Sequence, residues 1–227
     1  MAKSIRPGEA PICLAPFIVG YERNGMYFAQ DHKINTSNPE SIDLSDINGK
    51  ILVYERSVKE WFLEPAKKLI RIDSKSTPIG IWVDGNYQIL TNSPFIFITL
   101  MICISYYEGV QQYMEGKTSE NKSCKTFCKS INRIYNNIFR ESDLKRIYRD
   151  SRCGLFHSGM VKGDILANYD LEDAIQFTTE RVYLNPKLML THIIRDFNDY
   201  IELLRDPINE TTRENFDRMF TNLPNPL

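Results

Sequence analysis

Apolar residues that recur every three or four positions constrain the fold of this chain more than any other feature. The clearest stripe follows Asn185-Pro186, where proline at the first helical position is a start signal. Its members are Leu188, Leu190, Ile193, Ile194, Phe197, Tyr200, Ile201 and Leu204. Because a helix with one apolar face buries that face against a neighbour, the stripe predicts a helix packed into a mainly α domain.

Two earlier segments also carry helical signals. Residues 53–70 form a stripe with Pro65 in its middle, which predicts a kink or break, because proline cannot donate the helical hydrogen bond. Ser93-Pro94 starts a long helix that we expect to reach about Gly116. Its most apolar run, residues 95–104, is too short for a membrane span of about 20 residues, so we expect a buried helix and no membrane partner.

Two shorter amphipathic helices are expected at residues 127–138 and 144–151, the second capped by Ser142-Asp143. Two β-hairpins interrupt this pattern, one over residues 79–90 around an Asp-Gly turn and one over residues 175–184. The sequence therefore predicts an antiparallel bundle of four or five helices with one or two small hairpins.

The ends of the chain differ from its middle. Residues 1–50 are rich in turn formers and have only short apolar pieces, which predicts an irregular arm with at most a strand pair. Residues 51–207 hold the helical signals and form the expected helical domain. Residues 208–227 form a C-terminal extension with one weak helix near residues 213–220.

Charge and cysteine usage limit the classes of function. With 28 Lys and Arg against 29 Asp and Glu, the chain cannot hold nucleic acid by overall charge, and a local basic cluster would be needed. Five scattered cysteines predict reduced thiols in a cytoplasmic protein. Cys124 and Cys128 with His157 give three metal ligands, but no fourth stands at a zinc-like spacing, so we expect no metal and no cofactor.

Arg152 and His157 are the candidate catalytic residues. Arginine binds phosphate through a planar fork of donors, and histidine transfers protons near neutral pH, so the two supply parts that phosphodiester cleavage needs. In an ideal helix their side chains leave different faces unless the helix begins, bulges or bends between them, and Gly154 would permit a bend. An Arg and a His at this spacing also occur by chance in soluble proteins.

The segment Arg-Cys-Gly-Leu-Phe-His-Ser-Gly, residues 152–159, resembles the Arg-x(4–6)-His signature of the HEPN (higher eukaryotes and prokaryotes nucleotide-binding) superfamily. Many members of this superfamily of small helical domains are metal-independent RNases. The form Arg-Cys-Gly-Leu-Phe-His is especially similar to HEPN proteins of bacterial genomes and plasmids. The resemblance extends over residues 58–205, although only the motif is specific, and Cys153 stands where many members carry a polar residue such as Asn.

The resemblance implies an endoribonuclease of the bacterial toxin or anti-phage type, with RNA as substrate and an antitoxin or other regulatory protein as a further partner. His157 would move a proton to or from the reacting oxygens, Arg152 would stabilise the developing charge, and cleavage would leave a 2′,3′-cyclic phosphate. Glu108 is a third candidate that would orient either side chain, or alternatively an exposed helix acid. In-line cleavage uses an acid and a base, so one histidine per chain predicts a symmetric homodimer, which the resemblance also implies.

A basic cluster precedes the motif. Its candidate RNA-binding residues are Lys145, Arg146 and Arg149, with more lysines and arginines between residues 125 and 140. These residues form either an RNA-backbone track that leads to His157 or a solvated helix surface. A non-catalytic HEPN-like module that binds a nucleotide, RNA or a partner protein is the alternative function, and a structural subunit is the third.

Overall fold

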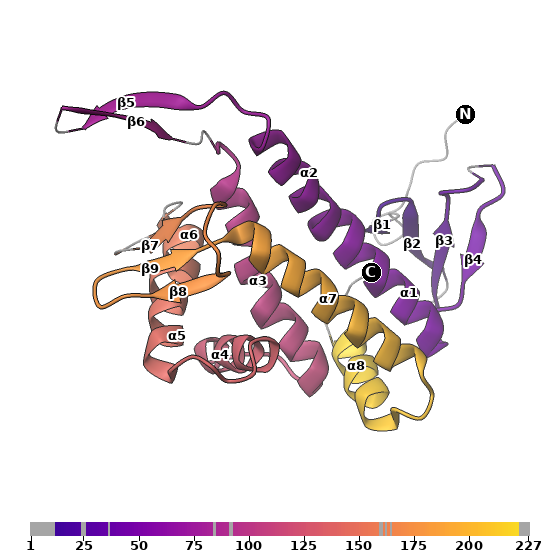
Figure 1. Cartoon of the computed structure of the whole chain (residues 1–227). Coiled ribbons are helices and arrows are strands. Elements are labelled where there is room, and N and C mark those ends of the chain that lie inside the picture. Colours follow the sequence, from indigo (N-terminus) through magenta and orange to yellow (C-terminus); the bar gives the residue numbers. More distant parts are fainter. Residues whose placement is uncertain are drawn as a thin grey trace. The chain divides into compact units, whose positions relative to one another are not determined.

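The structure, a computed structural model, is mainly helical with small sheets (Figure 1). It describes residues 12–222 except 24–25, 36, 84, 91–92, 159–160, 162 and 164, and only the backbone at 12, 22–23, 26–27, 79–81, 83, 88–90, 156–158 and 222. No helix in this described part has the length and apolar character needed to cross a bilayer.

The chain forms two compact units, each assembled from separated segments. The first unit contains Met1–Phe62, Gln112–Thr118 and Asn198–Leu227, and the second contains Leu63–Gln111 and Ser119–Phe197. The division into three consecutive segments at residues 50 and 207 stays a prediction.

An antiparallel sheet begins the first unit, where an irregular arm was expected. Its strands pair in the order of the chain: β1 (Ile12–Ala15), β2 (Ile18–Arg23), β3 (Met26–Asp31) and β4 (Glu40–Ile42). The prediction was wrong because β1 and β4 are short and β1 carries a bulge between Cys13 and Ala15, which breaks the two-residue alternation. One face of the sheet is buried with Val53, through side chains that include Ala15, Ile18 and Ala29.

Two helices of the first unit pack through aromatic rings. Helix α1 (Ile47–Val58) begins after Asp46, whose carboxylate accepts the N–H of Asn48 at 3.2 Å. Helix α8 (Glu210–Asn222) forms where a weak helix was predicted near residues 213–220. The Tyr54 ring lies 4.2 Å from the ring of Tyr113 and 5.4 Å from that of Phe216, centroid to centroid, and Phe216 is fully buried.

A π-helical turn, η1 (Lys59–Leu63), separates α1 from α2 (Glu64–Asp73). Pro65 lies in the first turn of α2, and it lacks the N–H that an α-helix would donate to the carbonyl of Trp61. The chain stays helical from α1 through η1 into α2, so the predicted break at Pro65 is absent, and the proline is accommodated by the π turn just before it.

Helices supply most of the second unit. Besides α2, they are α3 (Ile96–Glu115), α4 (Ser123–Ile134), α5 (Glu141–Ile147), the π turn η2 (Tyr148–Arg152), α6 (Cys153–Ser158) and α7 (Pro186–Arg205). The C-terminal parts of α3 and α7, from Gln112 and Asn198 on, belong to the first unit. The predicted apolar stripes meet in its core, where Tyr107, Phe127, Leu144 and Phe197 are fully buried. Asn185 caps α7, since its side-chain oxygen accepts the backbone N–H groups of Lys187 and Leu188 at 3.0 and 3.2 Å.

Two predicted details of these helices were wrong. Helix α4 ends at Ile134 because Asn136 and Asn137 adopt left-handed backbone angles, with φ of 54° and 58°, so Ile138 is 70 % exposed and leaves the stripe. Helix α5 begins at Glu141 without a side-chain cap, so the expected Ser142-Asp143 cap lies inside its first turn.

The second unit also holds small β-elements. Strands β5 (Ile79–Val83) and β6 (Asn86–Leu90) form the first predicted hairpin, and β8 (Ile175–Phe177) and β9 (Val182–Leu184) form the second. Gly85 has a φ of 78° in the first turn, which favours glycine, while Asp84 lies outside the described residues. Strand β7 (Ile165–Ala167) pairs in parallel with β9 and was not predicted.

Candidate functional site

The structure brings two predicted site residues together. Arg152 ends η2, and its Nη2 lies 3.3 Å from Oε2 of Glu108 on α3. The guanidinium carbon of Arg152 lies 5.6 Å from the centroid of the Tyr148 ring, within the range of a cation–π contact. The Arg152 side chain is 28 % exposed, so the guanidinium is held from two sides and still reaches the surface.

Glu108 is held by a second partner. Its Oε1 accepts the hydroxyl proton of Ser119 at 2.5 Å, and the Ser119 hydroxyl lies 3.3 Å from that of Ser123. The Glu108 side chain is 12 % exposed, so the alternative of an exposed helix acid is wrong. A carboxylate fixed in this way can orient Arg152, while its action on the reaction stays a prediction.

The π turn lies just before the motif. The N–H of Cys153 donates to the carbonyl of Tyr148, five residues earlier, and the hydroxyl of the buried Ser151 donates to the carbonyl of Ile147 at 2.5 Å. The bulge therefore ends at Arg152, and α6 runs as a helix through Gly154, the residue that would have permitted a bend.

The backbone of His157 belongs to α6, about 1.4 helical turns after Arg152. Its side chain lies outside the part of the chain that the structure describes. The proton-transfer role of His157 stays a prediction.

The predicted RNA-binding residues each have a partner within the chain. Lys145 forms an ion pair with Glu141 at 2.7 Å, and the Arg146 guanidinium donates to the backbone carbonyl of Glu180. Arg149 donates to both carboxylate oxygens of Asp150, at 2.6 and 2.7 Å. The three side chains are thus engaged with three separate groups, and their role in RNA binding stays a prediction.

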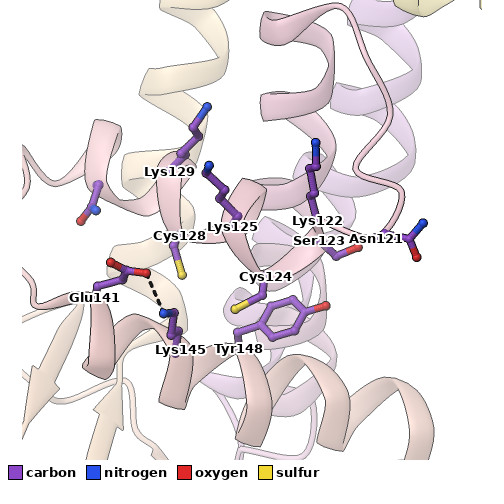
Figure 2. Close-up of a pocket in the computed structure, with 11 residues that line it drawn as sticks. Asn121, Lys122, Ser123, Cys124, Lys125, Cys128, Lys129, Glu141, Lys145 and Tyr148 are labelled. Atoms are coloured by element: carbon purple, nitrogen blue, oxygen red, sulfur yellow. Dashed lines mark ion pairs between the residues drawn. The ribbon is translucent and has the colours of Figure 1, made fainter.

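Lys145 and three further lysines line a pocket of about 930 Å³ between α4 and the segment α5–η2. Figure 2 shows Lys125 and Lys129 on α4 and Lys122 just before it, with the ion pair of Glu141 and Lys145 on α5 opposite them. Lys125 and Lys129 stand four residues apart, a spacing that places both side chains on one face of a helix. Both belong to the basic residues that the sequence analysis placed between 125 and 140, whereas Lys122 was not among them.

Two thiols and an aromatic ring complete the pocket wall. Cys124, Cys128 and Tyr148 line it, and Figure 2 shows the Tyr148 ring beside Cys124. Burial, followed by the proximity of Cys124, raises the pKa of the Cys128 thiol to about 12, so this thiol is neutral at physiological pH. Within the described residues, no three His, Cys, Asp or Glu side chains gather as a metal site requires.

A separate polar network lies on α7. Arg133 donates to both carboxylate oxygens of Asp196, and the Tyr106 hydroxyl donates to the same carboxylate at 2.7 Å. Nδ1 of His192 lies 3.3 Å from the Tyr135 hydroxyl, so His192 has a structural partner within the second unit. Burial, followed by the nearby Arg195 charge, lowers the pKa of His192.

Comparison with family models, with curated proteins and with solved structures finds no match to this chain. The function is therefore inferred from the site itself.

Proposed function

We propose that this chain is a metal-independent endoribonuclease with a HEPN-like helical bundle, of the kind used in bacterial toxin or anti-phage systems. One observation carries the proposal. Arg152 is held by Glu108 and by the Tyr148 ring at the end of a π turn, directly before the helix whose backbone contains His157. π turns of this kind occur frequently at functional sites.

The proposed reaction needs no group beyond the chain and its RNA. The ribose 2′-oxygen attacks the adjacent phosphorus as its proton is taken by a base, the bond from phosphorus to the 5′-oxygen breaks, and that oxygen receives a proton from an acid. His157 acts as one of these proton carriers, and Arg152 stabilises the negative charge on the pentacoordinate phosphorus. The products are a 2′,3′-cyclic phosphate and a 5′-hydroxyl.

A symmetric homodimer supplies the second proton carrier. A residue near a two-fold axis meets its own copy, so two chains bring two copies of His157 and of Arg152 to one phosphate. Glu108 then acts as a positioning residue, because its contact with Arg152 restricts the guanidinium. An antitoxin or other regulatory protein is the further partner that this class of function implies.

A non-catalytic binding module is the second candidate. Cys153 follows Arg152 where many HEPN nucleases carry a polar residue, and Arg152 already contacts the carboxylate of Glu108, with which a phosphate would have to share the guanidinium. Both observations favour a site that binds RNA or a nucleotide without cleaving it.

The deciding experiment compares three purified chains, namely wild type, His157→Ala and His32→Ala, on a structured RNA in EDTA. General acid–base help is worth about 10²- to 10⁴-fold, so we expect cleavage with 2′,3′-cyclic phosphate ends that falls by at least about 10²-fold in His157→Ala. His32 lies just after β3 and is the matched control, so its variant should cleave like wild type.

Three outcomes would overturn the nuclease proposal. Cleavage that His157→Ala retains would remove His157 from the mechanism. Cleavage that stops in EDTA and returns with a divalent ion would exclude a metal-independent reaction. RNA binding without cleavage by the wild-type chain would establish the second candidate.

A further inference from the structure

We infer that the pocket between α4 and α5–η2 binds a short single-stranded segment of RNA, about three nucleotides long, with its phosphates along α4. We name this pocket the lysine pocket, after Lys122, Lys125, Lys129 and Lys145 in its wall. The inference rests on the proposed function in taking RNA as the ligand. It specifies that the bound RNA is single-stranded, how long the bound segment is and where it lies, none of which follows from the motif alone.

Charge identifies the class of ligand as an anion. Among the described residues that line the lysine pocket, Glu141 is the only acid, so four lysines and one glutamate leave a formal charge of +3. The glutamate is paired with Lys145 at 2.7 Å, and the remaining positive charge lies along α4. A formal charge of +3 in one pocket wall, in a chain whose net charge is −1, forms the local basic cluster that nucleic-acid binding requires.

The floor of the lysine pocket does not oppose an anion. Cys124 and Cys128 lie between the lysines and α5 (Figure 2). Burial raises the pKa of the Cys128 thiol, so this side chain carries no negative charge near neutral pH. An anionic backbone can therefore lie over Cys128 without charge repulsion.

The spacing of the lysines favours a strand over a compact phosphate group. Lys122 and Lys129 are seven residues apart, which corresponds to about 10.5 Å along a helix. A stacked strand advances about 3.4 Å per nucleotide, so this distance covers about three phosphates. The phosphates of a nucleoside triphosphate are clustered at one end of the molecule and would contact only part of such a row.

The size of the lysine pocket favours one strand over two. Its volume of about 930 Å³ lies within the range of about 300–1,000 Å³ that is typical of small-ligand sites. Double-stranded RNA is bound across its wide minor groove by surfaces that extend over many base pairs, whereas single strands enter grooves with basic and aromatic walls.

Tyr148 connects the lysine pocket to the candidate catalytic residues. Its ring lines the pocket, and the guanidinium of Arg152 lies 5.6 Å from the centroid of the same ring. A strand that occupies the lysine pocket would therefore leave it beside Arg152. The bound segment would flank the phosphate that is cleaved.

The test measures binding in the His157→Ala chain, so that no RNA is cleaved. Binding of a fluorescein-labelled single-stranded hexaribonucleotide is followed by fluorescence anisotropy. Two proteins are compared, the His157→Ala chain and the same chain with Lys125→Gln/Lys129→Gln in addition. Each lost phosphate contact lowers the slope of log K against log salt by about 0.7 for single strands, so we expect a slope lower by about 1.4 and affinity at least about tenfold weaker at low salt. The matched control adds Lys67→Gln/Lys68→Gln on α2 and should leave both values unchanged.

A second measurement locates the ligand. Alkylation of Cys124 by iodoacetamide is followed by mass spectrometry with and without the hexaribonucleotide, and Cys13, which is exposed in the first unit, is the internal reference. We expect the bound strand to slow the labelling of Cys124 several-fold and to leave Cys13 unaffected.

The inference fails if the two double variants bind equally well, or if Cys124 is labelled at the same rate with and without RNA. Equal affinity for a duplex of the same sequence would overturn the single-strand assignment. Displacement by a nucleoside triphosphate at similar concentration would assign the lysine pocket to a free nucleotide instead. Lysine-dependent binding by a wild-type chain that cleaves no RNA would remove the nuclease proposal alone, and cleavage by a chain without lysine-dependent binding would remove this inference alone.

Discussion

Two arginine–carboxylate pairs in the second unit have similar burial and different geometry. Arg133 contacts both oxygens of Asp196, which also accepts the Tyr106 hydroxyl proton. Arg152 contacts Glu108 through Nη2 at 3.3 Å and lies over an aromatic ring. The carboxylates are each 12 % exposed, so exposure alone does not distinguish the pairs.

The difference separates a structural pair from a candidate functional one. A two-point contact fixes the direction of a guanidinium, and a third donor on the same carboxylate stabilises the contact between helices α4 and α7. A longer ion-pair contact restrains an arginine less strongly, so a phosphate can approach it at a smaller cost. We therefore expect stability to depend mainly on Arg133 with Asp196, and activity mainly on Arg152.

The largest expected effect is on catalysis. Arg152→Lys replaces the planar fork with a single ammonium group, so we expect RNA cleavage to fall about 10²-fold, which is about 2.7 kcal/mol of transition-state stabilisation. The change in the free energy of unfolding should stay within about 0.5 kcal/mol. Single-turnover cleavage and urea unfolding measure the two quantities. A stable Arg133→Lys variant with the larger loss of cleavage would reverse the comparison.

The second effect is on stability. Asp196→Ala leaves the partly buried Arg133 and the Tyr106 hydroxyl without their shared acceptor, so we expect the free energy of unfolding to fall by about 2 kcal/mol. Glu108→Ala is the matched variant and should cost less, about 1 kcal/mol, because Arg152 keeps its contact with the Tyr148 ring and the Ser119 hydroxyl keeps Ser123 as a neighbour. Equal losses in urea unfolding would show that contact geometry does not separate the pairs.

The smallest effect is on the pH dependence of stability. Because burial lowers the pKa of His192 below its unfolded value near 6.5, the unfolded chain binds a proton more readily there, and stability should decrease as the pH falls below about 6.5. His192→Gln should show a shallower fall of Tm between pH 7.5 and 5.5. Parallel curves for the two chains would exclude His192. A flatter curve of Tm against pH for His192→Gln would assign the pH dependence of stability to His192, separately from any pH dependence of cleavage through His157.

Local signals predicted the parts of the fold that depend on nearby residues. The stripe of α7, its Asn185 cap and the two hairpins each follow from a few neighbouring residues. The sheet of β1–β4 was missed because β1 and β4 are short and β1 is bulged, and because its stability comes from packing against residues such as Val53 of α1.

The candidate site was predicted only in part. The motif identified Arg152, but the contact with Glu108 depends on the packing of α3 beside η2, which no local pattern shows. The π turn has no proline within it, so composition gave no signal for it. The lysine pocket needs α4 and α5 to face each other, so the sequence indicated one basic region over residues 125–152 but not which of its lysines share a pocket.

The π turn η2 also determines the rotational phase of the helix that follows it. Each residue turns an α-helix by about 100°, so one additional residue in the turn rotates every later position by that angle around the axis. The side of α6 on which position 157 lies is thus decided between Tyr148 and Arg152, upstream of the motif. Insertion or deletion of one residue before Arg152 in this turn would rotate the whole motif about the helix axis without changing the motif's own sequence.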